Sequence, residues 1–63
     1  MNRSQLIERK QQVIAQISQT RRELERERAR QSGGRRVREL EQRLDALMAE
    51  EYRLRLEIDR SRH

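Results

Sequence analysis

Gln31-Ser32-Gly33-Gly34-Arg35 is the stretch that decides the fold of this chain. It holds both glycines of the sequence, and no proline occurs anywhere, so the backbone reverses direction here at the least cost. The runs on either side are rich in Glu, Arg, Gln and Leu, which are good helix formers, and neither contains a helix breaker. The sequence therefore predicts an all-α fold, an antiparallel helical hairpin of the coiled-coil kind.

The hairpin is expected to occupy residues 1–63 as a single αα domain. Its first helix is predicted over about 3–30, its turn over 31–35 and its second helix over about 35–60. Asn2, with Gln5 three residues later, resembles a capping box at the first helix start. One continuous helix is the alternative, but its heptad phase would break between the arms, and each glycine would cost roughly 1 kcal/mol relative to alanine.

Each arm carries a heptad ladder of its own. Folding about Gly34 sets opposite each other residues whose numbers sum to 68. Leu24 is then expected against Leu44, and Ile14 against Leu54. Every a position faces a d position in this register, as antiparallel pairing requires. The two ladders are Ile7, Lys10, Ile14, Ile17, Arg21, Leu24, Arg28 and Gln31, and Val37, Leu40, Leu44, Leu47, Glu51, Leu54 and Ile58.

Polar residues interrupt both ladders. Arg21 and Arg28 are expected opposite leucines, with their methylene stems on the leucines and their guanidinium groups in water. Glu51 is expected opposite Ile17 and should reach an arginine or the rim, because an isolated buried carboxylate is costly. Such residues either set register and oligomeric state or extend to solvent, and both readings stay open here.

The chain is too small and polar to bury a thick core by itself. It has 63 residues, of which 32% are hydrophobic and 43% charged. The apolar stripe of the first arm is also wider than a two-stranded coiled coil needs. We therefore expect a homodimer that forms a four-helix bundle, in outline similar to the ROP type of paired hairpins. The expected oligomer seam is Leu6, Ile7, Val13, Ile14, Ile17, Leu24, Leu40, Leu44, Leu47, Leu54 and Ile58.

A second apolar stripe runs along the second arm at Met48, Tyr52 and Leu56. These residues are spaced by four, and Tyr52 and Leu56 lie well around the helix from the first stripe. A second copy of the hairpin would bury such a stripe. The functional alternative is a docking surface for a different protein, with Tyr52 as its aromatic anchor.

The net charge of +5 is concentrated around the turn. Residues 21–38 hold eight arginines and three glutamates, whereas the rest of the chain is neutral. Arginines beside a glycine pair and a helix start suit phosphate or an acidic partner. A solvated face laced with salt bridges is the alternative, and the region has no aromatic residue for base stacking. The candidate contacts are Arg26, Arg30, Arg35, Arg36 and Arg38.

Enzymatic function is not expected. A two-helix hairpin offers no closed pocket for a small-molecule substrate, and His63, the single histidine, is terminal. The sequence has no cysteine and no clustered histidines, so we expect no metal and no cofactor. No stretch reads as a signal peptide or a membrane span, and the expected location is the cytoplasm without membrane contact.

These features predict a small regulatory or adaptor protein that binds a partner protein through its helical faces, such as an accessory or inhibitor protein of a phage or plasmid. Binding of nucleic acid by the arginines near the turn is the alternative. A third possibility is a self-assembly element whose partner is another copy of itself. The absence of aromatic residues near the turn favours protein binding over nucleic-acid binding.

Overall fold

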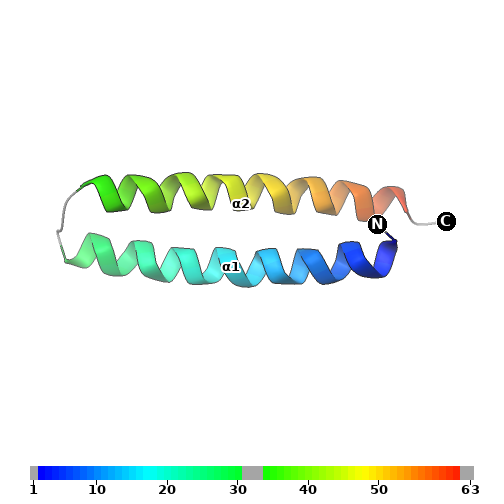
Figure 1. Cartoon of the computed structure of the whole chain (residues 1–63), viewed down its shortest axis with the longest axis horizontal. Coiled ribbons are helices and arrows are strands. Elements are labelled where there is room, and N and C mark those ends of the chain that lie inside the picture. Colours follow the sequence, from blue (N-terminus) through cyan, green and yellow to red (C-terminus); the bar gives the residue numbers. More distant parts are fainter. Residues whose placement is uncertain (1, 31–33, 62–63) are drawn as a thin grey trace.

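The computed structural model of the chain describes residues 2–30 and 34–61. Two helices, α1 (Arg3–Ala29) and α2 (Gly34–Arg60), pack side by side as an antiparallel hairpin, with the termini at one end and the turn at the other (Figure 1). The hairpin is 49 Å long. The predicted hairpin is confirmed, and a single continuous helix is excluded. Gln31, Ser32 and Gly33 of the predicted turn, and His63, lie outside the described residues.

The start of α1 is the capping box that the sequence predicted. The Asn2 side chain accepts a hydrogen bond from the Gln5 backbone N–H at 2.8 Å, and the Asn2 N–H donates to Gln5 Oε1 at 3.1 Å. Both bonds satisfy backbone donors that have no partner in the first turn of a helix. Such a cap stabilises a helix by about 1 kcal/mol, so α1 begins at Arg3.

The core is a single layer of apolar side chains between the helices. The central cluster lies in the half of the hairpin that holds the termini, and Leu44 and Ile58 pack against it. Leu24 and Leu40 are buried in the half next to the turn. On α2 the buried leucines are those of the predicted ladder. The central cluster is Leu6, Val13, Ile17, Leu47 and Leu54.

The predicted ladder of α1 is wrong at alternate positions. Ile7 and Ile14 are 36% and 45% exposed, while Leu6 and Val13, one residue earlier, are buried. The predicted phase would have brought Arg21 and Arg28 to the interface, whereas the observed phase brings Thr20 and Glu27, whose side chain is 20% exposed and pairs with Arg30. The observed phase instead buries Thr20, whose hydroxyl donates to the Gln16 carbonyl at 2.7 Å. A small hydroxyl that is satisfied by its own helix costs far less to bury than a guanidinium group.

The predicted register is also wrong, by about one helical turn. Arg9 pairs with Glu50 and Glu23 with Arg36, and in both pairs the residue numbers add to 59. The pair on the opposite side of the interface, Arg28 with Glu41, adds to 69. The centre of the interface lies between these two sides. Residues of α1 and α2 at the same height, meaning the same position along the long axis of the hairpin, therefore have numbers that add to about 64 rather than 68.

Several predicted contacts change with this register. Leu24 is level with Leu40, although Leu24 and Leu44 still line one groove from adjacent layers. The contact predicted between Ile14 and Leu54 is wrong, because Ile14 points to solvent. Arg21 and Arg28 are exposed, as predicted for their guanidinium groups, and they line a groove together with Leu24 and Leu44. The leucines predicted opposite them change with the register.

Candidate protein-interaction surface

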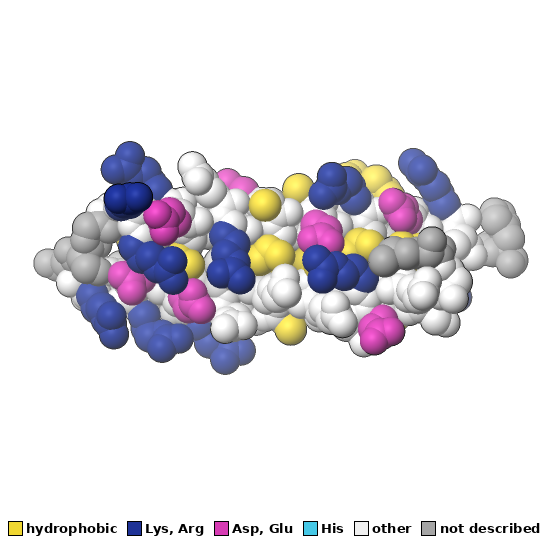
Figure 2. Space-filling view, viewed as in Figure 1, with side chains coloured by type: hydrophobic (Ala, Val, Ile, Leu, Met, Phe, Trp, Pro, Cys, Tyr) yellow, Lys and Arg dark blue, Asp and Glu magenta, His cyan; other side chains and the backbone are white. Residues whose placement is uncertain are grey.

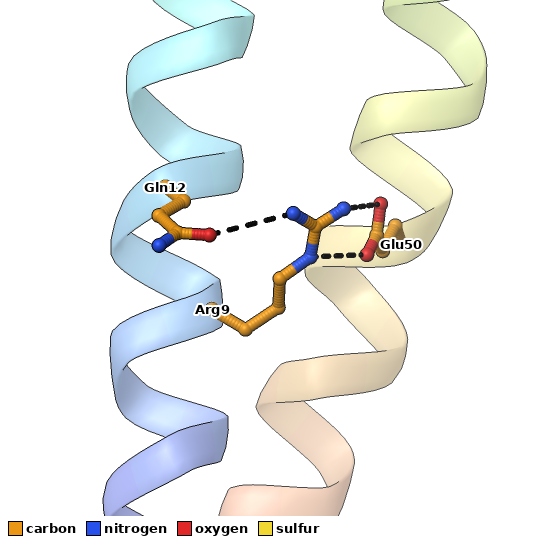
Figure 3. Close-up of polar contacts among 3 residues, drawn as sticks. All are labelled: Arg9, Gln12 and Glu50. Carbon is orange, nitrogen blue, oxygen red and sulfur yellow. Dashed lines mark hydrogen bonds and ion pairs between the residues drawn. The ribbon is translucent and has the colours of Figure 1, made fainter.

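Ion pairs across the interface define one side of the hairpin, which we call the Arg9 side. Arg9 Nε donates to Glu50 Oε2 at 2.9 Å and Arg9 Nη2 donates to Glu50 Oε1 at 3.2 Å, a forked arrangement that Gln12 supports from the same helix (Figure 3). Glu23 and Arg36 pair at 3.6 Å on the same side, nearer the turn. Residues seven apart lie in the same row along a helix, so Arg9 and Glu23 share one row of α1, and Arg36 and Glu50 share one row of α2. These two rows lie next to each other along one side of the interface.

The opposite side, which we call the Ile14 side, is marked by the ion pair of Arg28 and Glu41 at 3.4 Å. Ile14 lies two heptads before Arg28, and Met48 lies one heptad after Glu41, so both residues share the rows of this pair. Ile7 continues the row of α1 toward the N-terminus. This side therefore changes from charged near the turn to apolar near the termini.

Most of the large hydrophobic side chains that are exposed among the described residues lie on this side or at its edge, and Leu56 lies on the adjoining outer surface of α2. Tyr52 is four residues after Met48 and Leu56 four residues after Tyr52, and each step turns about 40° farther from the interface. Tyr52 thus points outward from the Ile14 side at 58% exposure, and Leu56 lies another 40° around α2, on the surface directed away from α1. We call this set the apolar face, and its members are Ile7, Ile14, Met48, Tyr52 and Leu56.

The sequence found only part of this face. Met48, Tyr52 and Leu56 were expected at the surface and are exposed. Ile7 and Ile14 were expected inside the hairpin, and their exposure enlarges the face from three residues to five. A signal for this was present, because the neighbours Leu6–Ile7 and Val13–Ile14 cannot all point at one partner helix.

A shallow groove of about 320 Å³ continues the Ile14 side toward the turn. Its floor holds Leu24 and Leu44, and charged residues of both signs form its rim. Because the charges alternate in sign, the groove suits a charged protein surface better than a polyanion. The rim residues are Arg21, Glu25, Arg28, Glu41 and Asp45.

Glu51 shows how the interface tolerates a carboxylate. Its position in α2 is interfacial and its side chain is only 14% exposed. Arg55 Nη2 donates to both oxygens of Glu51, at 2.8 and 3.1 Å, as the sequence predicted for this residue. The hydrogen bond with Glu51, followed by the Glu51 charge, raises the pKa of Arg55 above its usual value. The pair keeps a charged group beside the apolar face without leaving it unpaired.

The turn region gathers only some of the predicted phosphate contacts. Arg26, Arg30 and Arg36 line a groove of about 250 Å³ on the Arg9 side, where two glutamates accompany them. Arg35 instead pairs with Glu39 at 3.6 Å. Arg38 donates to the Gly34 carbonyl of its own helix at 3.4 Å.

The charge distribution is visible on the molecular surface. Figure 2 shows one face, on which Lys and Arg side chains crowd toward the turn and acidic side chains are interspersed. Hydrophobic side chains show mainly as a row between the helices and along one edge. Arg28, Arg30, Arg35 and Arg36 pair with carboxylates, so acidic groups interrupt the basic surface near the turn.

Two other kinds of site, a metal centre and a membrane span, concern residues 2–30 and 34–61. Within those residues, no three metal-ligating side chains are grouped, and neither helix is long and apolar enough to cross a membrane. Comparisons with protein-family models, curated proteins and solved structures found no match to this chain.

Proposed function

We propose that the chain is a small non-enzymatic regulator or adaptor that works by binding protein, with the apolar face as its binding surface. The observation that carries this proposal is the placement of four large exposed hydrophobic side chains on one side of the hairpin, with Leu56 on the adjoining outer surface of α2. Scattered exposed hydrophobic residues are ordinary on a soluble protein. A contiguous set of this size marks an interaction surface.

The size of the face supports a real interface. A large hydrophobic side chain has a total surface on the order of 200 Å². Because the exposed fractions of the five residues lie between 36% and 58%, together they expose on the order of 450 Å². A standard protein interface uses about 800 Å² on each partner. The apolar face thus supplies more than half of such a patch, and the adjoining polar residues would supply the rest.

Dimerisation through this face, with formation of a four-helix bundle, is the form of binding that we propose. Two hairpins that bury the apolar face against each other give each helix a second helical neighbour, which is the packing that a bundle requires. The thin core also favours it, since one layer of side chains in a 63-residue chain gives little stability alone. The Arg9 side stays outside the bundle and is left for other partners.

Sedimentation equilibrium of the native chain and of a matched pair of variants tests this proposal. Tyr52→Ala removes the aromatic anchor of the apolar face and should weaken the dimer at least tenfold, in line with the cost of a central interface aromatic. Arg53→Ala, its exposed neighbour on the Arg9 side, is the control and should leave the dimer unchanged. A native chain that stays monomeric at millimolar concentration contradicts the dimer.

A second candidate function, binding of nucleic acid near the turn, rests on the net charge of +5 within residues 21–38. Arginines 26, 30 and 36 share one groove, and the surface ion pairs that hold two of them are weak enough to exchange for phosphate. Such binding should weaken steeply with salt because counterions are released. The glutamates of the groove oppose it, so we rank it second.

Fluorescence anisotropy with a labelled duplex tests this second function. Replacing Arg30 and Arg36 with Gln should reduce the affinity and flatten its salt dependence. Replacing Arg53 and Arg60 with Gln removes the same charge near the termini and serves as the control. Equal effects of the two double variants would indicate nonspecific attraction by net charge alone.

A further inference from the structure

Heights along the hairpin show how two apolar faces would match. Residues of α1 and α2 at the same height have numbers that add to about 64, as the ion pairs across the interface require. Ile14 is then level with position 50, between Met48 and Tyr52 of α2. Ile7 is level with position 57, beside Leu56. The apolar residues of one helix therefore lie at the heights of the apolar residues of the other.

The charged half of the Ile14 side obeys the same relation. Arg21 is level with position 43, between Glu41 and Asp45, and Glu25 is level with position 39, beside Arg38. Each of these charges on α1 thus finds the opposite charge at its own height on α2. Over residues 2–30 and 34–61, Arg21, Glu25 and Asp45 make no ion pair within the hairpin.

On the premise of the dimer proposed above, we propose that the second copy is related by a two-fold axis parallel to the helices, so that both turns lie at the same end. This operation places α1 of each copy over α2 of the other without changing any height. Ile14 then packs between Met48 and Tyr52 of the second copy. Arg21 reaches the partner's Glu41 and Asp45 along the charged half.

The competing arrangement has its two-fold axis perpendicular to the helices. That operation reverses the heights, and the apolar face lies nearer the termini than the turn. The two faces then meet only if the hairpins slide apart, which leaves both turn halves overhanging and their charges unmatched. The parallel axis buries the full length of the Ile14 side, and much of the basic charge near the turn lies on the Arg9 side, away from the contact.

The separation of the two turns distinguishes the arrangements. A single spin label at Arg35→Cys, a residue whose side chain is 94% exposed, reports this separation in the dimer by double electron–electron resonance. The parallel axis predicts a distance below about 30 Å, from a bundle with helices about 10 Å apart. The perpendicular axis predicts more than about 50 Å, from a rise of about 1.5 Å per residue along two overhanging halves.

Charge reversal tests the contact itself. Arg21→Glu should weaken the dimer about tenfold, because it sets like charges together twice across the two-fold axis. Arg22→Glu makes the same change one residue away, on the outward face of α1, and should have little effect. Adding Asp45→Arg to Arg21→Glu should restore most of the lost affinity without changing the free energy of unfolding of the dilute monomer, a control that is needed because both residues line one groove within the hairpin.

The outcomes separate this inference from the proposed function. A dimer with distant turns, or with equal responses to Arg21→Glu and Arg22→Glu, overturns the parallel arrangement and leaves dimerisation intact. A chain that is monomeric at all concentrations overturns both. A short distance between the turns, with rescue by Asp45→Arg, supports both.

Discussion

In the half of the hairpin that holds the termini, a cluster of five buried apolar residues joins the helices, and the outer surface of the Ile14 side is apolar as well. In the half next to the turn, Leu24 and Leu40 are the buried apolar residues among those described, and ion pairs surround them. Burial of a leucine contributes several times as much as an exposed ion pair. The terminal half should therefore hold the hairpin together, while the turn half follows it.

The difference has a consequence for function. The residues that form the apolar face should lie on a well-ordered part of the hairpin, because an interface loses affinity when its residues must first be ordered. They project from the half with the larger core. The arginines near the turn project from the weaker half, where partial opening would change their spacing. Protein binding thus has the better-supported surface of the two candidate functions.

The largest effect is expected from Leu47→Ala in the central cluster. It removes a buried side chain that the single core layer cannot replace, and should lower the free energy of unfolding by about 3 kcal/mol. Met48→Ala, its exposed neighbour, should cost less than about 1 kcal/mol in dilute solution. Chemical denaturation followed by circular dichroism measures both. Similar losses for the two variants would mean that the chain is already assembled through Met48.

An intermediate and local effect is expected from Leu40→Ala in the turn half. Leu40 is almost fully buried, but the turn half can open without the rest, so the loss should stop at about 2 kcal/mol. Hydrogen exchange should rise at backbone amides of residues 22–29 and 35–43 and stay slow around Ile17. Uniformly faster exchange over both helices would show that the two halves unfold as one unit.

The smallest effects are expected from the ion pairs. A double-mutant cycle on Arg9 and Glu50, which form a half-buried fork, should give a coupling of about 1 kcal/mol. The same cycle on Glu23 and Arg36, whose atoms are 3.6 Å apart, should give about 0.3 kcal/mol and vanish in 1 M salt. A larger coupling near the turn would reverse the comparison between the two halves.

The hairpin and the interface of α2 were predictable from the residues alone. The glycine pair offers a place to reverse the chain, and the apolar residues of α2 at the interface form one unambiguous stripe, as in Leu40, Leu47 and Leu54. The capping box at Asn2 was predictable for a similar reason, since it depends on residues three apart. Local patterns of this kind specify elements before any tertiary contact forms.

The phase of α1 and the register could not be read from hydrophobicity, because adjacent apolar pairs such as Val13 and Ile14 fit two phases equally well. The choice depends on the polar residues that each phase brings to the interface farther along, Thr20 and Glu27 or Arg21 and Arg28, and on the cost of removing them from water. The sequence signal for the observed register was the set of opposite charges that it brings together, Arg9 with Glu50 and Glu23 with Arg36. These pairs can be recognised only when the two helices are placed side by side in a given register.

The sequence by itself determined that this chain makes two helices, that the glycine pair lies between them and which residues of α2 face inward, since these follow from breakers, caps and a single apolar stripe. Only the tertiary structure decided which side of α1 faces α2, and with it that Ile7 and Ile14 join Met48 and Tyr52 on one exposed face. The physical reason is that an ambiguous helix takes its orientation from the cost of burying its polar residues, and that cost exists only once a partner helix removes the water.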